Sequence, residues 1–175
     1  MKRKRNKYQL LLLRKIKKSD PPKISQAFLS QGWNKPTSQY EQYFQYQENG
    51  ERDIIIAELD GAFAGYLTIK WKSDYPPFQE KGIPEIVDFN VLKKYQRHSI
   101  GTRLMNEAEN RIQKVSEFAG IGFGVYQDYG AAQILYIKRG YIPDGRGLIQ
   151  NSVSLKYGDS ITIDDSIVFC LIKKL

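Results

Sequence analysis

The chain has 175 residues, of which 41% are hydrophobic and 26% are charged, and its formal net charge is +8 at pH 7. This length fits one ordinary domain with a substantial core, and the composition excludes a disordered or fibrous protein. The only cysteine, Cys170, excludes an internal disulfide and a cysteine-rich metal site, and it favours a reducing compartment. We therefore expect a single domain over residues 1–175 and a cytoplasmic location.

Positive charge is concentrated near the N-terminus, where residues 2–18 carry nine Lys or Arg and no Asp or Glu. Such a run can attract nucleic acid, an anionic membrane or a phosphorylated ligand, but it is also typical of a solvated tail. No helix-turn-helix, RNA-binding aromatic signature or zinc pattern accompanies it, so nucleic acid is not an expected partner. The apolar run of residues 10–13 is too short for a signal peptide, because Arg14 and Lys15 interrupt it. No other apolar run is long enough to span a bilayer. We interpret residues 1–7 as a basic tail and expect no membrane partner.

The first half of the chain predicts a strand, two helices and a hairpin. Two prolines after Asp20 are typical of a helix start, and aromatic residues at helical spacing predict the second helix. Asp60-Gly61 between two apolar runs predicts a tight hairpin turn. In chain order we expect a strand over 8–16, a helix starting at 19–22, a helix over 35–47, and strands over 53–58 and 62–71.

The second half alternates strands and helices after a loop. Three prolines and one glycine in residues 72–84 predict a loop without a regular element. Beyond it we expect a strand over 85–92, a helix over 100–118, a strand over 120–126, a helix over 131–138 that Gly140 stops, and a closing strand over 166–172. This order predicts a mixed sheet flanked by helices.

Residues 85–102 run from a strand through a short basic loop into a helix. Backbone N–H groups of such a loop, together with the first unpaired N–H groups of the helix, form a cradle that suits a pyrophosphate. Small residues let the ligand approach the backbone closely. Lys93, Lys94, Arg97 and His98 add positive charge around the entrance.

Here the sequence resembles the GNAT superfamily of N-acetyltransferases, whose coenzyme signature is Gln or Arg, two residues, Gly, one residue, then Gly or Ala. The chain reads Gln96-Arg97-His98-Ser99-Ile100-Gly101, so Ser99 stands in place of the first glycine. The resemblance implies an α/β protein with the acyl-CoA N-acyltransferase fold, in which helices flank a mostly antiparallel central mixed sheet. It also implies acetyl-CoA as cosubstrate.

A second feature of the family lies downstream. Ala132, Tyr136 and Gly140-Tyr141 match an Ala, Tyr, Gly-aromatic pattern on the last helix, with Tyr129 in place of the usual Asn. The resemblance implies that Tyr136 is the general acid that protonates the coenzyme thiolate, whereas tyrosines on amphipathic helices are usually structural.

Transfer to an amine also needs a general base. Strand alternation places Glu85, Val87, Phe89 and Val91 on one face, where Glu85 is the only ionisable group, and partial burial would raise its pKa toward that of a useful base. The resemblance implies this role for Glu85. A strand-end carboxylate in solvent or paired to a lysine is the alternative reading, and Asp88 is the reserve candidate.

The resemblance implies a set of coenzyme-binding residues around the basic loop. The backbones of Phe89 and Val91 correspond to those that pair with the pantetheine arm and polarise the thioester carbonyl. The expected coenzyme-binding residues are Phe89, Val91, Gln96, Arg97, His98, Ser99, Ile100, Gly101 and Thr102. His98 is the only histidine, and without companion ligands no metal site is expected.

Together these residues predict an N-acetyltransferase that passes the acetyl group of acetyl-CoA to a primary amine of a small molecule, by direct attack in a ternary complex. A non-catalytic acyl-CoA-sensing module and a protein or peptide N-acetyltransferase are the alternatives. By the family's layout, residues 71–78 and 141–147 would border the acceptor. The sequence leaves open the acceptor's identity, whether the chain forms a homo-oligomer, and the role of the basic N-terminus.

Overall fold

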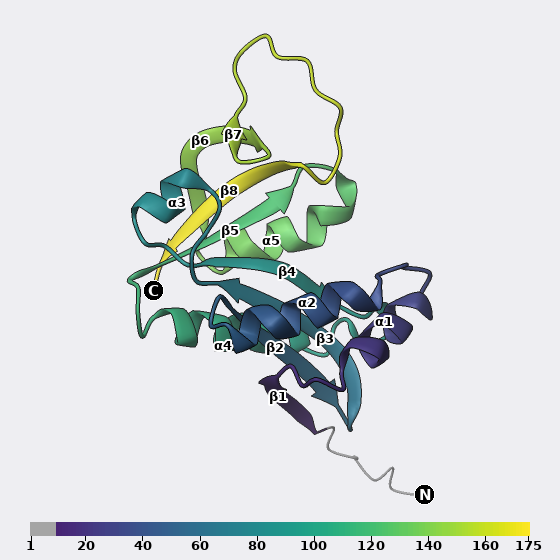
Figure 1. Cartoon of the computed structure of the whole chain (residues 1–175). Coiled ribbons are helices and arrows are strands. Elements are labelled where there is room, and N and C mark those ends of the chain that lie inside the picture. Colours follow the sequence, from purple (N-terminus) through teal and green to yellow (C-terminus); the bar gives the residue numbers. More distant parts are fainter. Residues whose placement is uncertain (1–9) are drawn as a thin grey trace, which may run out of the picture. The chain divides into compact units, whose positions relative to one another are not determined.

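The structure is a computed structural model that describes residues 10–175 (Figure 1). The expected basic tail, residues 1–7, lies outside the described residues, as do residues 8 and 9 of the expected first strand. The chain divides into two compact units. The first comprises residues up to Thr68 together with residues 88–107, and the second comprises residues 69–87 and 108–175. A single functional domain over the whole chain stays a prediction.

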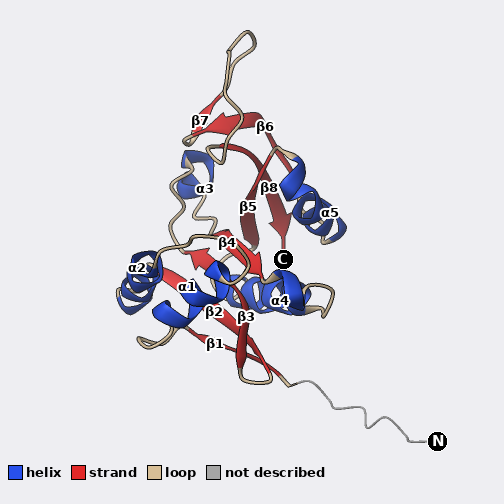
Figure 2. Cartoon of the chain, turned by 90° about the vertical axis from the view of Figure 1, so that its right-hand side faces the viewer, coloured by secondary structure: helices blue, strands red, loops and turns tan. Residues whose placement is uncertain are grey.

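The first unit is a sheet with helices on both faces. Its elements are β1 (Leu11–Lys15), α1 (Pro21–Leu29), α2 (Thr37–Glu48), β2 (Arg52–Leu59), most of β3 (Ala62–Lys70), the end of β4 (Glu85–Val91), the 3-10 turn η1 (Lys93–Tyr95) and the start of α4 (Ile100–Ile112). Hydrogen-bonded neighbours follow the order β1-β2-β3-β4, and β1 is antiparallel to β2. Figure 2 shows α1 and α2 on one side of β2 and β3, with α4 on the other. Asp60 and Gly61 both have positive φ, as the predicted hairpin turn requires.

The core of the first unit is aromatic. Phe28 of α1 is fully buried, stacks on Tyr40 of α2 with ring centroids 6.2 Å apart, and meets the edge of Tyr66 at 6.0 Å. Ile54 and Ile56, two positions apart on β2, join the same cluster, as strand alternation requires. The tyrosines that predicted the second helix are therefore its buried face.

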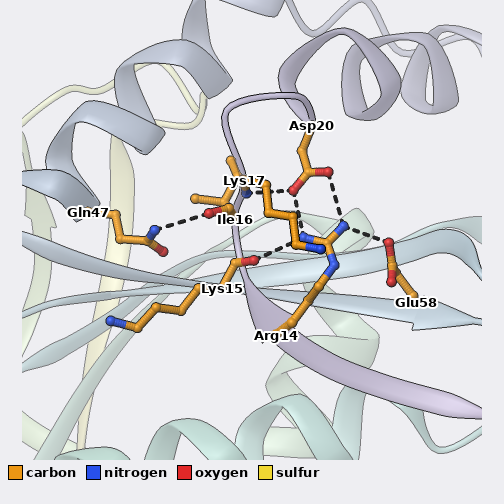
Figure 3. A network of polar contacts seen from close by, with 7 residues as sticks. All are labelled: Arg14, Lys15, Ile16, Lys17, Asp20, Gln47 and Glu58. Atoms are coloured by element: carbon orange, nitrogen blue, oxygen red, sulfur yellow. Dashed lines mark hydrogen bonds and ion pairs between the residues drawn. The ribbon is translucent and has the colours of Figure 1, made fainter.

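Arg14 ties three elements of the first unit together (Figure 3). Its guanidinium donates to both carboxylate oxygens of Asp20, at 2.6 and 3.0 Å, and to Oε1 of Glu58 on β2, at 2.6 Å. Oδ2 of Asp20 also accepts the N–H of Lys17 at 2.7 Å. Asp20 precedes Pro21 at the predicted helix start, but its side chain binds Arg14 instead of capping α1. This network fixes β1, β2 and the start of α1.

The second unit is a mixed sheet in which β8 lies between β5 and β6 (Figure 1). Its further elements are α3 (Pro76–Glu80), β5 (Phe118–Gly124), the 3-10 turn η2 (Gln127–Tyr129), α5 (Gly130–Lys138), β6 (Ile142–Gln150), β7 (Val153–Ser154) and β8 (Ile167–Lys174). The beginning of β4 runs parallel to β5, with Glu85 opposite Gly120, whereas β5–β8, β6–β8 and β6–β7 are antiparallel. Within residues 10–175, eight strands thus follow the order β1-β2-β3-β4-β5-β8-β6-β7, and the predicted fold class is confirmed.

Two sequence predictions, for residues 72–84 and for residues 100–118, need correction. The expected loop 72–84 contains the short helix α3, because Pro76 and Pro77 occupy its first turn, where their missing N–H groups are not needed. The helix expected over 100–118 ends at Ile112, since Val115 is 69% exposed and β5 starts at Phe118.

Strand β6 was not expected at all. Gly145 and Gly147 have positive φ, and the pairing of β6 with β8 shifts register between Pro143 and Leu148. A strand with such an irregularity lacks the regular alternation that sequence reasoning relies on.

Candidate active site

The basic loop of the first unit has the backbone of an anion cradle. Arg97 and Ser99, two positions apart, have left-handed φ values of 63° and 58°. Left-handed residues in such a turn direct successive N–H groups to one side of the chain. Helix α4 begins at Ile100, directly after Ser99, and the first N–H groups of a helix have no acceptor within it. This backbone is compatible with the expected pyrophosphate site, which stays a prediction.

Ser99, which stands where the signature has its first glycine, is left-handed, with a φ of 58°. Glycine adopts a positive φ without strain, whereas a residue with a Cβ pays roughly 1 kcal/mol for it. Sequence reasoning had attributed the preference to the small size of the side chain. The structure adds a conformational reason.

The last glycine of the signature has a packing reason. A Cβ on Gly101 would lie 3.0 Å from Cζ of Phe89, so the ring of Phe89 lies directly against the first turn of α4. Gly65, which sequence reasoning did not single out, plays a similar part. A Cβ there would lie 2.6 Å from the carbonyl oxygen of Asn90, so β3 passes close to the end of β4. Phe89 and Gly65 thereby position the strand that leads into the basic loop.

Strand β4 is irregular at Asp88, whose φ is 54°. The expected alternation of Glu85, Val87, Phe89 and Val91 on one face is therefore wrong beyond Val87, because a left-handed residue breaks the period of two. The carboxylate of Asp88, the reserve candidate for the base, accepts a hydrogen bond from Nη1 of Arg52 at 3.1 Å. Asp88 is thus engaged in an ion pair in the first unit.

Glu85 lies at the start of β4, in the second unit, and is half-buried. Its Oε2 accepts a hydrogen bond from the hydroxyl of Ser73 at 2.6 Å. Ser73 is fully buried, and sequence reasoning did not select it. The candidate base is therefore held by a serine hydroxyl.

Tyr136 lies on α5 and is 4% exposed. Its ring contacts Phe123 of β5 and Tyr141, with centroids 6.5 and 6.2 Å apart. Burial raises the pKa of Tyr136 well above its usual value, so the phenol keeps its proton at neutral pH, as a general acid requires. The same burial also fits a structural tyrosine.

The sequence model of the acetyltransferase (GNAT) family matches residues 14–141 of this chain. The chain belongs to this family. It is accordingly an acetyl-CoA-dependent N-acetyltransferase, as the coenzyme signature predicted. Among curated proteins, no sequence is similar enough to count as a match.

Solved structures show the same fold as this GNAT protein. An N-acetyltransferase from Staphylococcus aureus has a TM-score of 0.70 at 15% identity, over 94% of this chain and 98% of that one. The protein yncA of Salmonella typhimurium, solved with its cofactor acetyl-CoA, has a TM-score of 0.65 at 14% identity, over 94% of this chain and 93% of that one. A ribosomal-protein-alanine N-acetyltransferase from Brucella melitensis has a TM-score of 0.67 at 16% identity, over 94% and 99%.

The departure at Tyr129 from the GNAT pattern also has a structural reason. A Cβ on Gly124 would overlap the ring of Tyr129, so the glycine makes room for the larger side chain. The hydroxyl of Tyr129 donates to Oδ1 of Asp165 at 3.0 Å. A tyrosine is thus accommodated where the family usually has an asparagine.

The two segments expected to border the acceptor touch each other in the second unit. The hydroxyl of Tyr75 donates to Oδ2 of Asp144 at 2.8 Å, and Oδ1 of Asp144 accepts the N–H of Arg146 at 3.0 Å. Asp144 therefore joins residues 71–78 to residues 141–147.

Among residues 10–175, no group of three or more His, Cys, Asp or Glu side chains is placed to hold a metal ion. Within the same residues, no helix is long and apolar enough to cross a membrane.

Proposed function

We propose that this GNAT enzyme transfers the acetyl group to a primary amine of a small molecule, by direct attack of the amine in a ternary complex. The binding of acetyl-CoA in this proposal rests on the backbone of the basic loop, with left-handed residues at 97 and 99 directly before a helix. Acetyl-CoA supplies a thioester with a good leaving group. In this proposal the loop residues 96–102 bind its pyrophosphate, and the backbones of Phe89 and Val91 pair with its pantetheine arm.

Two residues of the second unit carry the proton transfers. Glu85 takes a proton from the attacking amine, directly or through water, and the hydrogen bond from the Ser73 hydroxyl holds its carboxylate. Tyr136 donates a proton to the departing sulfur, because its raised pKa keeps the phenol protonated. A cytoplasmic location stays part of the proposal.

Two alternatives remain testable. The first alternative acceptor is an amine of a protein or peptide, because a ribosomal-protein-alanine N-acetyltransferase has a similar fold. A shared fold does not by itself imply a shared substrate. A module that senses acyl-CoA without turnover is the other, and the presence of both Glu85 and Tyr136 argues against it.

The test is a panel of small amines, diamines and peptides, assayed for release of the coenzyme thiol, with the acetylated product confirmed by mass. We expect turnover with a small amine. Tyr136→Phe should lose most turnover and retain coenzyme binding, whereas Tyr157→Phe, which alters a fully exposed tyrosine of the same unit, should lose neither. Turnover with peptides alone would shift the assignment to a protein acceptor, and binding without any turnover would support the sensing module.

A further inference from the structure

Ser73 makes two hydrogen bonds through one buried hydroxyl. Its Oγ accepts the N–H of Tyr75 at 3.0 Å, and its hydroxyl donates to Oε2 of Glu85 at 2.6 Å. Because the Tyr75 N–H contributes its own proton, the proton of the Ser73 hydroxyl is directed to the carboxylate. A charged carboxylate can only accept, so the direction of this hydrogen bond is fixed.

The segment that carries Ser73 is itself firmly held. The ring of Tyr75 packs edge-on against Phe78, with centroids 4.9 Å apart, and both residues are almost fully buried. Phe78 in turn occupies the space in front of Gly120, where any Cβ would overlap its ring. Gly120 is the residue opposite Glu85 in the pairing of β4 with β5.

Helix α3 therefore places Ser73 beside the strand pair that carries Glu85. Three features hold the Ser73 hydroxyl in place. They are the prolines that start α3, the packing of Phe78 against Gly120, and the hydrogen bond from the Tyr75 N–H. The hydroxyl of this fully buried serine donates to a half-buried carboxylate. A hydrogen bond donated to a carboxylate stabilises its charged form.

We propose that Ser73 is the positioning residue of the general base: its hydroxyl fixes the orientation of the Glu85 carboxylate and keeps it in the charged form that accepts the amine proton. This inference rests on the proposed function, in which Glu85 is the base. Ser73 acts through Glu85 and contacts neither substrate in this account.

The decisive variant is Ser73→Ala, which removes the hydroxyl and keeps the backbone. We expect turnover at neutral pH to fall by roughly 10-fold, a fraction of what a general base supplies. The Michaelis constant for acetyl-CoA should stay unchanged, and the acidic limb of the pH profile should move to higher pH. Ser116→Ala is the matched control, because Ser116 also bridges nearby backbone groups in the second unit, at 2.8 and 3.2 Å, without contacting Glu85.

A double mutant separates positioning from general loss of structure. In a Glu85→Gln background, Ser73→Ala should cause no further loss of turnover, because its effect passes through Glu85. A further loss of the same size in that background would show that Ser73 acts independently of Glu85 and would overturn the proposal.

A direct titration tests whether the Ser73 hydroxyl stabilises the Glu85 carboxylate, even if no acceptor amine is found. The midpoint of the Glu85 carboxyl titration, followed by carbon NMR of the whole chain, should move to higher pH in Ser73→Ala and stay fixed in Ser116→Ala. An unmoved midpoint would overturn the proposal whatever the activity. A moved midpoint together with normal turnover of Glu85→Gln would instead show that Glu85 is not the base. Ser73 would then position a carboxylate without a role in catalysis.

Discussion

The hydroxyl of Tyr75 donates a 2.8 Å hydrogen bond to Oδ2 of Asp144, and so joins the segment before α3 to the irregular strand β6. Burial and the neighbouring carboxylate raise the pKa of Tyr75 well above its usual value, so the phenol remains a donor at neutral pH. This hydrogen bond connects the two segments that we propose to border the acceptor amine.

Tyr75→Phe tests that connection. It removes the hydroxyl, keeps the ring that packs on Phe78, and should cost about 1 kcal/mol of unfolding free energy. We expect the Michaelis constant of the acceptor to rise several-fold, while that of acetyl-CoA stays unchanged. Steady-state kinetics with each substrate varied in turn checks this, with Tyr157→Phe as the control. Equal increases for both substrates would speak against an acceptor-side role.

Ser99→Gly should stabilise the first unit and keep or tighten coenzyme binding, because glycine relieves the left-handed strain at φ 58°. The expected gain is about 1 kcal/mol in thermal unfolding. Ser99→Val should weaken coenzyme binding, since a β-branched residue fits a positive φ poorly and obstructs the backbone cradle.

Ser152→Gly is the matched control for that series. Ser152 also has a positive φ, 67°, in the turn between β6 and β7. The substitution should stabilise the protein by a similar amount without changing coenzyme affinity in calorimetry. If all three Ser99 forms bind the coenzyme equally, the pyrophosphate does not lie on this loop.

Gly101→Ala should weaken coenzyme binding, because the new Cβ would lie 3.0 Å from Cζ of Phe89 and displace either the ring or the helix start. Overpacking of this kind costs about 1–3 kcal/mol. Phe89→Leu in the same chain should recover part of the loss, since a smaller side chain makes room. Thermal unfolding and calorimetry with acetyl-CoA check both effects. An equally weak double variant would mean that Phe89 is not the obstacle.

The contacts of Arg14 predict how stability depends on pH. Burial opposes the charge on Asp20, but the hydrogen bonds from Arg14 and the Lys17 N–H outweigh it, so the pKa of Asp20 lies below its usual value. The hydrogen bond from Arg14 likewise lowers the pKa of Glu58. Because both pKa values are lower in the folded state, this stabilisation is fully present above the unfolded values of about 4 and is lost as pH falls through the folded ones.

Asp20→Asn should therefore lower the free energy of unfolding by about 2–3 kcal/mol at pH 7 and flatten its fall toward acid pH. Urea unfolding between pH 7 and pH 2 measures both effects. Glu41→Gln, an exposed acid on α2, is the control and should leave the curve close to that of the unmodified chain. An unchanged acid slope in Asp20→Asn would mean that other carboxylates carry the acid sensitivity.

The sequence predicted those parts of the fold whose local signals agree with the final structure. Asp60-Gly61 needs positive φ at both positions and lies between two apolar runs, so the hairpin was predictable from local chemistry alone. The prolines after Asp20 likewise predicted the start of α1, where they occupy the first turn. The tyrosines of α2 predicted that helix, because their helical spacing places them on its buried face.

The remaining features depend on contacts between distant residues. Helix α3 forms where Phe78 meets Gly120, and β6 continues across an irregularity because β8 pairs with it on both sides. The left-handed Asp88 broke the alternation used to group Glu85 with Phe89. Ser73 belongs to no motif, and only the folded chain brings it within 2.6 Å of Glu85.

The pH profile of Glu85→Gln tests the central proposal most directly. If Glu85 is the general base, turnover with a confirmed amine should fall by roughly 10²–10⁴-fold while affinity for acetyl-CoA stays nearly intact. The acidic limb of the profile should disappear, and the residual rate should climb with pH as free amine accumulates. Normal turnover with an unchanged acidic limb would contradict this account and move the base to Asp88 or to solvent.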